Sequence, residues 1–257
     1  MSRARPASPL EHRRSLLTWN VLADAHIRRE WYPEVPDAHL RGPGRARRVL
    51  SCLRRWDADI IALQEVSEDT WATLVAAFPA HGAAFVSTGA DGLGLLVRGE
   101  VPEAAALPLP GGRMALLGTL RGGPRVAVVH LSYTPPDSSG PRQGVAELRA
   151  VCAAEPDLVV GDLNAPPGSL ERAVLASAGF VDRSPPGPTF RSNGAPQALD
   201  AIATGPGWCA AAATLPALPA SRPLPDLANP SDHLPLRASL WRNGGTRIPA
   251  PTTGARR

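Results

Sequence analysis

Short apolar runs and amphipathic segments alternate along the chain. Runs rich in Val, Ile and Leu, bounded by polar residues or by Gly and Pro, predict β-strands. These runs fall at residues 15–21, 59–66, 82–98 (two strands), 114–133 (two strands), 158–160 and 233–241. Apolar residues spaced three and four apart predict helices at residues 45–56, 141–153 and 169–178, and a further helix beginning at Ser67.

Several predicted strands follow one another with no helix between them, which argues against a purely doubly wound sheet. The pattern favours an α/β fold with two mixed β-sheets packed together and helices on the outside. We expect one domain over residues 15–241. Residues 1–14 form a basic amino end that we expect to be flexible, and residues 242–257, rich in Gly, Pro, Thr and Arg, form a basic tail that we expect to be disordered.

Composition indicates the kind of protein and its cellular compartment, but not any reaction that it catalyses. The 257 residues are 44% hydrophobic, enough for a sizeable core, and no apolar run approaches the roughly 20 residues of a membrane span. The basic amino end lacks the apolar stretch of a secretory signal, and the three cysteines, Cys52, Cys152 and Cys209, are far apart. We therefore expect a cytoplasmic protein that does not contact membranes and acts as a monomer.

The net charge of +4 comes from an unusual basic composition, since all 27 basic residues are Arg. Guanidinium groups bind phosphate in a bidentate manner, so the charge permits an anionic substrate such as nucleic acid. A coding bias towards GC-rich codons would also produce many Arg, Ala and Pro residues, and this compositional interpretation is the stronger one.

Polar side chains stand at the ends of the apolar runs. In the segment 157–167, DLVVGDLNAPP, Asp162 and Asn164 leave a buried strand on the same side, because side chains alternate along a strand. The same arrangement recurs at the other predicted strand ends, with Asn20, Glu65, His130, Asp200, and the pair Asp232 and His233. Carboxylates, amides and imidazoles that converge would suit a divalent cation and a phosphate group.

Each of these residues also has a structural interpretation when taken alone. Asn20 is typical of a turn, Glu65 of the start of a helix, and His130 of a hydrogen-bonded core histidine. Asp162 and Asn164 could form an Asx turn before two prolines. Asp200 could be structural, and residues 231–233 could cap the segment that follows. The order and setting of the whole set therefore carry the functional hypothesis.

That ordered set resembles the endonuclease/exonuclease/phosphatase superfamily of metal-dependent phosphodiesterases and phosphatases. The matching motifs are TWN (18–20), LQE (63–65), HLS (130–132), GDLN (161–164), LDAI (199–202) and SDH (231–233). The amino-terminal part, with WNVLADAHIRREWYP and DADIIALQEV, is most similar to deadenylase-type and nocturnin-type members. The resemblance implies that residues 15–241 fold as a four-layer α/β sandwich with the site at one rim of two packed sheets.

The resemblance also implies a role for each motif residue. Glu65 would bind Mg²⁺, or alternatively Mn²⁺, and Asp232 would complete the metal site directly or through water. Asp162 would act as general base, and His233, paired with Asp200, would donate to a phosphate oxygen. Three further residues would both bind the substrate and act in catalysis. Asn20 would orient Glu65, Asp162 or the phosphate, His130 would donate to the phosphate, and Asn164 would hold the water or a phosphate oxygen. Members of the abasic-endonuclease type carry a second acid two residues after the first Asn, where this chain has Leu22, and Asp24 is a poorer substitute.

We therefore predict a Mg²⁺-dependent phosphodiester hydrolase, a nuclease that attacks RNA or DNA with an in-line water. One alternative keeps the enzyme and changes the substrate to a small phosphorylated metabolite or a lipid. Another is a non-catalytic binding module on the same fold. A degenerate module would be expected to lose Glu65, Asp162 or His233, and all three are present.

Overall fold

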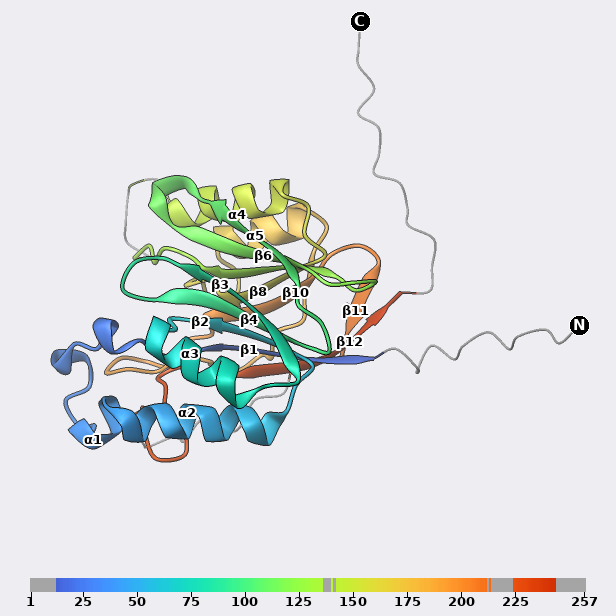
Figure 1. The fold of residues 1–257 in the computed structure, drawn as a ribbon. Helices are drawn as coiled ribbons and strands as arrows, with labels where there is room; N and C mark the ends of the chain where they lie inside the picture. Colours follow the sequence, from blue (N-terminus) through green and yellow to red (C-terminus); the bar gives the residue numbers. More distant parts are fainter. Residues whose placement is uncertain (1–12, 136–139, 141, 212, 214–223, 244–257) are drawn as a thin grey trace, which may run out of the picture.

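Two six-stranded mixed sheets lie face to face, with helices on both outer faces (Figure 1). The computed structural model describes residues 13–135, 140, 142–211, 213 and 224–243. The first sheet contains β1 (Arg14–Asn20), β2 (Ile60–Gln64), β3 (His81–Ser87), β4 (Gly92–Arg98), β11 (Trp208–Ala210) and β12 (Leu236–Arg242). The second contains β5 (Glu103–Pro108), β6 (Met114–Thr119), β7 (Arg125–His130), β8 (Leu158–Asp162), β9 (Val181–Asp182) and β10 (Asp200–Thr204).

The helices are α1 (Asp37–Leu40), α2 (Pro43–Trp56), α3 (Glu68–Ala77), α4 (Gln143–Ala153) and α5 (Leu170–Ser177). Three short 3₁₀ turns add Asp24–His26, Arg29–Trp31 and Pro110–Gly112. Helices α2 and α3 lie on the outer side of the first sheet, and α4 and α5 lie on the outer side of the second (Figure 1). The predicted four-layer α/β sandwich is confirmed.

Side-chain alternation along β2 shows how the layers are held together. Ile60 and Ala62 point into the cluster between the two sheets, and Ile61 and Leu63 point into the cluster beneath α2 and α3. All four residues are fully buried. A strand buried on both faces is a continuous apolar run, which is the pattern visible in the sequence.

Strand direction brings the polar strand ends to one rim. Each sheet has a parallel pair at its centre, β1 with β2 and β7 with β8, and antiparallel neighbours on either side. One rim of the two packed sheets therefore contains the carboxyl ends of the four parallel strands. The amino ends of β4, β10 and β12 lie at the same rim. In the second sheet His130 pairs with Asp162, and Asp162 pairs with Asp200.

The last strand differs from its prediction at both ends. The last strand was expected over residues 233–241, but β12 begins at Leu236, because Pro235 cannot donate a hydrogen bond to a sheet. His233 instead forms an isolated bridge with Phe190. The strand continues through Arg242, one residue beyond the predicted end of the domain.

The edge strand β5 was not predicted. Its sequence, EAAALP, is half alanine and lacks the β-branched residues that mark a strand. At the amino end, β1 starts at Arg14, one residue inside the segment expected to be flexible. The rest of that segment up to residue 12, and residues 244–257 of the predicted tail, lie outside the described residues. Within the described part of the chain, no helix is long and apolar enough to cross a membrane.

Candidate active site

Asn20 links the two sheets at the rim. Its side chain is completely buried, and its amide nitrogen donates to Glu65 Oε1 at 2.8 Å and to Asp162 Oδ2 at 3.1 Å. Its Oδ1 accepts the backbone N–H of Leu22 at 3.0 Å. One neutral side chain thus aligns a carboxylate from each sheet, and its role in catalysis stays a prediction.

Three residues at this rim have left-handed backbone conformations that non-glycine residues rarely adopt: Leu22 (φ 58°), Glu65 (φ 55°) and Asn164 (φ 49°). Each such residue costs of order 1–3 kcal/mol and persists only where the surrounding structure enforces it. The turns that leave β1, β2 and β8 are therefore constrained to present their polar groups in one place. Strain of this kind is typical of functional sites.

Asp162 serves two purposes at once. Its Oδ1 accepts the backbone N–H of Asn164 at 2.8 Å, which forms the Asx turn considered as a structural alternative. Its Oδ2 points to the other side, where His233 Nε2 lies at 3.6 Å and His130 Nε2 at 3.7 Å. The structural and functional interpretations of this residue are therefore compatible.

The ionisation of Asp162 follows from its neighbours. Burial acts to raise its pKa, but the electrostatic influence of the His233 and His130 imidazoles and the hydrogen bonds from Asn164 and Asn20 outweigh burial and hold the pKa below its ordinary value. The carboxylate is consequently ionised and able to accept a proton at neutral pH.

His233 is held by Asp200 from behind. The His233 Nδ1 atom lies 2.9 Å from Asp200 Oδ2, which directs Nε2 towards Asp162. Burial acts to lower the pKa of His233, but the carboxylates of Asp200 and Asp162 raise it well above the ordinary value. The imidazolium form, with a proton to donate from Nε2, is therefore favoured.

The remaining predicted residues occupy the same rim. His130 Nε2 lies 3.7 Å from Glu65 Oε1, so this imidazole faces carboxylates of both sheets. Asn164 uses one amide N–H to bind Leu131 O at 2.8 Å. Asp232 is almost fully buried and accepts the Tyr32 hydroxyl at 2.7 Å. Burial and the neighbouring charge of Glu65 raise the pKa of Asp232.

Sequence reasoning missed several supporting side chains. Tyr32 binds Asp232, and the Thr189 hydroxyl accepts the backbone N–H groups of Leu199 and Asp200 at 3.0 and 3.1 Å. His26 and Asp91, bonded to each other at 2.9 Å, were also missed. Asp91 stands directly before the apolar run of β4, so a search of strand beginnings as well as strand ends would have found it.

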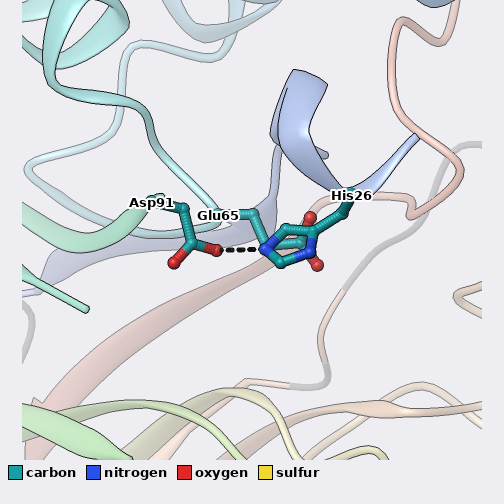
Figure 2. Close-up of side chains that lie close together, drawn as sticks. All are labelled: His26, Glu65 and Asp91. Carbon is teal, nitrogen blue, oxygen red and sulfur yellow. Dashed lines mark hydrogen bonds and ion pairs between the residues drawn. The ribbon is translucent and has the colours of Figure 1, made fainter. Parts of the chain in front are cut away.

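The described residues offer two groups that could hold a divalent cation: one is Asp162, Asp200 and His233, and the other is His26, Glu65 and Asp91 (Figure 2). In each group the three ligand atoms lie within 4.8 Å of one another. The mixture of carboxylate oxygens with an imidazole nitrogen fits a divalent metal. Asp232, predicted as a second ligand beside Glu65, belongs to neither group, and its role stays a prediction.

Comparison with known proteins identifies the class. The sequence matches the model of the Endonuclease/Exonuclease/phosphatase family over residues 17–233. The chain belongs to this family, and the resemblance seen in its motifs is confirmed. Members are hydrolytic phosphoesterases that depend on a divalent metal, so the chain is an enzyme of that kind. A comparison with curated proteins found no match.

Three of the solved structures that are similar to this chain are the following. The catalytic domain of human Nocturnin with a bound sulfate anion has a TM-score of 0.70 and 21% identity, covering 90% of this chain and 94% of that chain. ANGEL2, a 2′,3′-cyclic phosphatase, in complex with adenosine-2′,3′-vanadate has a TM-score of 0.69 and 17% identity, and the match covers 89% of this chain and 95% of that chain. D. rerio TDP2 complexed with single-strand DNA product has a TM-score of 0.62 and 17% identity, and the match covers 90% of this chain and 99% of that chain. At these identities the likeness shows the fold.

Proposed function

We propose that the protein is a Mg²⁺-dependent phosphodiester hydrolase, a nuclease that cleaves RNA or DNA by in-line attack of water. The main support for this proposal is that the side chains of Asp162, His233 and His130 point into the same space at the rim. Asp162 Oδ2 is 3.6 Å from His233 Nε2 and 3.7 Å from His130 Nε2, too far for direct hydrogen bonds. A water molecule and the oxygens of a phosphate would find an acceptor and two donors there.

Asp162 is the group proposed to activate water. It is ionised in the free protein because its pKa is held low. A substrate phosphate brings negative charge next to it, and a like charge raises the pKa of a carboxyl group. Substrate binding would therefore make Asp162 a stronger base when the proton of the water must be removed. Asn164, whose amide also binds Leu131 O, would orient the same water or a phosphate oxygen.

The two histidines are proposed as donors to the phosphate. His233 would donate from Nε2 to a non-bridging oxygen while Asp200 holds its Nδ1 and supports its charge. His130 would donate from the neighbouring strand β7. As negative charge builds up on the phosphate in the transition state, both donors bind it more strongly.

Glu65 is the proposed metal ligand, with Asp232 acting directly or through water. A bound divalent cation would neutralise phosphate charge and stabilise the leaving alkoxide. Asn20 would keep Glu65 and Asp162 aligned through the two hydrogen bonds that its amide donates.

Two exposed aromatic residues that are close in sequence to site residues favour nucleic acid over a small metabolite. Trp31 is 44% exposed and adjoins Tyr32, which binds Asp232. Tyr133 is 53% exposed and lies three residues after His130. Aromatic faces of this kind stack on unpaired bases. The amino-terminal similarity to nocturnin-type members and the excess of Arg also favour nucleic acid as the substrate.

The three unpaired cysteines support a reducing compartment such as the cytoplasm. We propose that the protein acts there as a monomer.

The test is a panel of labelled substrates assayed with Mg²⁺, with Mn²⁺ and with a chelator. The panel contains single- and double-stranded DNA and RNA, RNA ending in a 2′,3′-cyclic phosphate, nucleotides and inositol phosphates. Asp162→Asn protein, purified in parallel, controls for contaminating nucleases. Metal-dependent cleavage of an oligonucleotide that the control lacks would support the proposal. Cleavage of small phosphoesters alone would favour the metabolite alternative, and equal activity in chelator would overturn the metal-dependent mechanism.

Replacing the exposed aromatics separates the substrate classes further. We expect Trp31→Ala and Tyr133→Ala each to raise KM for single strands by about tenfold, because stacking contributes about 1–3 kcal/mol per base. Hydrolysis of a small chromogenic phosphodiester should not change. Val101→Ala, which shortens a side chain 75% exposed between β4 and β5, is the surface control. Equal loss on both substrates would argue against a stacking role.

A further inference from the structure

His26, Glu65 and Asp91 come together from three separate parts of the chain. His26 ends the 3₁₀ turn that follows β1, Glu65 directly follows β2, and Asp91 directly precedes β4. Figure 2 shows the three side chains pointing towards one another, with His26 bonded to Asp91. None of the motif residues other than Glu65 belongs to this group.

We propose that His26 and Asp91 are metal ligands that share the cation of Glu65. They would replace the acid that this chain lacks at Leu22. The inference rests on the proposed function only in taking Glu65 as a metal ligand. It adds an imidazole nitrogen and a second carboxylate to that site, at residues outside the motifs that define the family resemblance.

The three ligand atoms lie close enough together for small side-chain movements to bring them onto one divalent cation. Metal–ligand bonds of about 2.1 Å place two ligands of the same cation no more than about 4.2 Å apart. His26 Nε2 and Asp91 Oδ2 are 2.9 Å apart, and all three ligand atoms lie within 4.8 Å. The His26 side chain is 46% exposed on a short turn, so it can close the remaining gap and let water complete the coordination.

The local hydrogen bonds prepare the donor atoms. The Thr88 hydroxyl donates to Asp91 Oδ1 and leaves Oδ2 turned towards His26. The Ala23 backbone N–H donates to Glu65 Oε2 at 3.1 Å. Two ionised carboxylates close together repel each other unless a positive charge lies between them. A bound dication would supply that positive charge.

The ligand set also indicates which cation it prefers. Mg²⁺ favours oxygen ligands, whereas an imidazole nitrogen is better suited to first-row transition metals. The site should therefore bind Mn²⁺ more tightly than Mg²⁺. His26→Gln should reduce this preference, because it removes the imidazole nitrogen and leaves a side chain that can still donate to Asp91.

The experiment measures Mn²⁺ binding directly, with no substrate present. Electron paramagnetic resonance gives the fraction of free Mn²⁺, and electron spin-echo modulation detects a coordinated ¹⁴N nucleus. We expect the wild-type protein to bind one Mn²⁺ with ¹⁴N modulation, and Asp91→Asn to bind at least about tenfold more weakly. His26→Gln should lose the ¹⁴N signal. His130→Gln is the matched control and should keep the signal, because His130 lies outside the group.

The outcomes separate this inference from the proposed function. If Glu65→Gln alone weakens Mn²⁺ binding while His26→Gln and Asp91→Asn bind like wild type, the inference is wrong and the Glu65 site stands. Loss of the ¹⁴N signal in His130→Gln would also overturn the inference, since it would place the cation at the opposite histidine. Melting temperatures test whether the His26–Asp91 hydrogen bond has only a structural role. In that case His26→Gln and Asp91→Asn would change stability and leave Mn²⁺ affinity unchanged.

Discussion

Asp162 and Asp200 lie directly opposite each other on the neighbouring antiparallel strands β8 and β10, and both are almost completely buried. Two carboxylates facing each other in this way are destabilising without a compensating charge. His233 supplies it, with Nδ1 at 2.9 Å from Asp200 Oδ2 and Nε2 at 3.6 Å from Asp162 Oδ2. The buried triad is thus both a stable arrangement and a source of a positively charged donor.

The first prediction concerns the pH dependence of His233. Its pKa is raised because Asp200 and Asp162 favour the imidazolium. If the imidazolium is the active form, activity falls as pH rises through this pKa. Asp200→Asn removes one negative charge and lowers the pKa, so the alkaline limb of the kcat/KM profile should move to lower pH. Asp37→Asn, at a carboxylate 90% exposed, should leave the limb in place. An unmoved limb in Asp200→Asn would mean that Asp200 is structural or that another group titrates.

The second prediction concerns the need for metal. Glu65→Gln keeps an oxygen that can accept the Asn20 amide, whose bond to Oε1 is 2.8 Å, and removes the charge that attracts a cation. The Mg²⁺ concentration for half-maximal activity should rise by about tenfold or more, with partial recovery at high Mg²⁺. Glu68→Gln makes the same chemical change three residues later, in the exposed first turn of α3, and should not alter the Mg²⁺ requirement. An unchanged requirement in Glu65→Gln would remove Glu65 from the metal site.

Much of the architecture could be predicted from the sequence because its signals are local. The run Ile60-Ile61-Ala62-Leu63 is buried on both faces of the sheet, and such a run is recognisable without knowing its partners. The strand ends at Asn20, His130 and Asp162 could be found in the same way, since a polar residue follows the apolar run, with only Gly161 between them at Asp162. Their convergence then follows from the parallel pairing of the central strands.

The missed residues depend on pairing that no local pattern records. Asp91 lies beside Glu65 because β4 runs antiparallel to β2, with Leu63 opposite Gly94. His26 and Tyr32 reach the rim through the turns that follow β1, whose path is set by the small cluster around Leu22. The exposed strand β5 was missed for another reason, since an alanine-rich run carries no strand signal.

The third prediction concerns the backbone that delivers Asp162. Gly161 has a φ of 129°, and a Cβ atom there would lie 2.1 Å from Val129 O on the neighbouring strand β7. Gly161→Ala must therefore distort either the strand pairing or the turn, and should lower the free energy of unfolding by more than about 2 kcal/mol. Chemical denaturation measures the change. Gly187→Ala, where nothing lies within 4 Å of the added Cβ, should be close to neutral. Equal stability of the two variants would contradict the close approach of β7 and β8.

The last prediction concerns Asp162 itself. In the wild-type protein the backbone N–H of Asn164 donates to Asp162 Oδ1 at 2.8 Å. Asp162→Asn can preserve this Asx turn, because the Oδ1 atom of Asn can accept the same N–H group. It removes the basic oxygen that faces His130 and His233, so the single-turnover rate should fall by about 10²- to 10⁴-fold. Oligonucleotide affinity should be kept or slightly increased, since a negative charge leaves the site. Melting temperature and circular dichroism establish that the variant is folded. Near-wild-type turnover in a folded Asp162→Asn protein would show that the carboxylate only shapes the turn, and would overturn its proposed role in activating water.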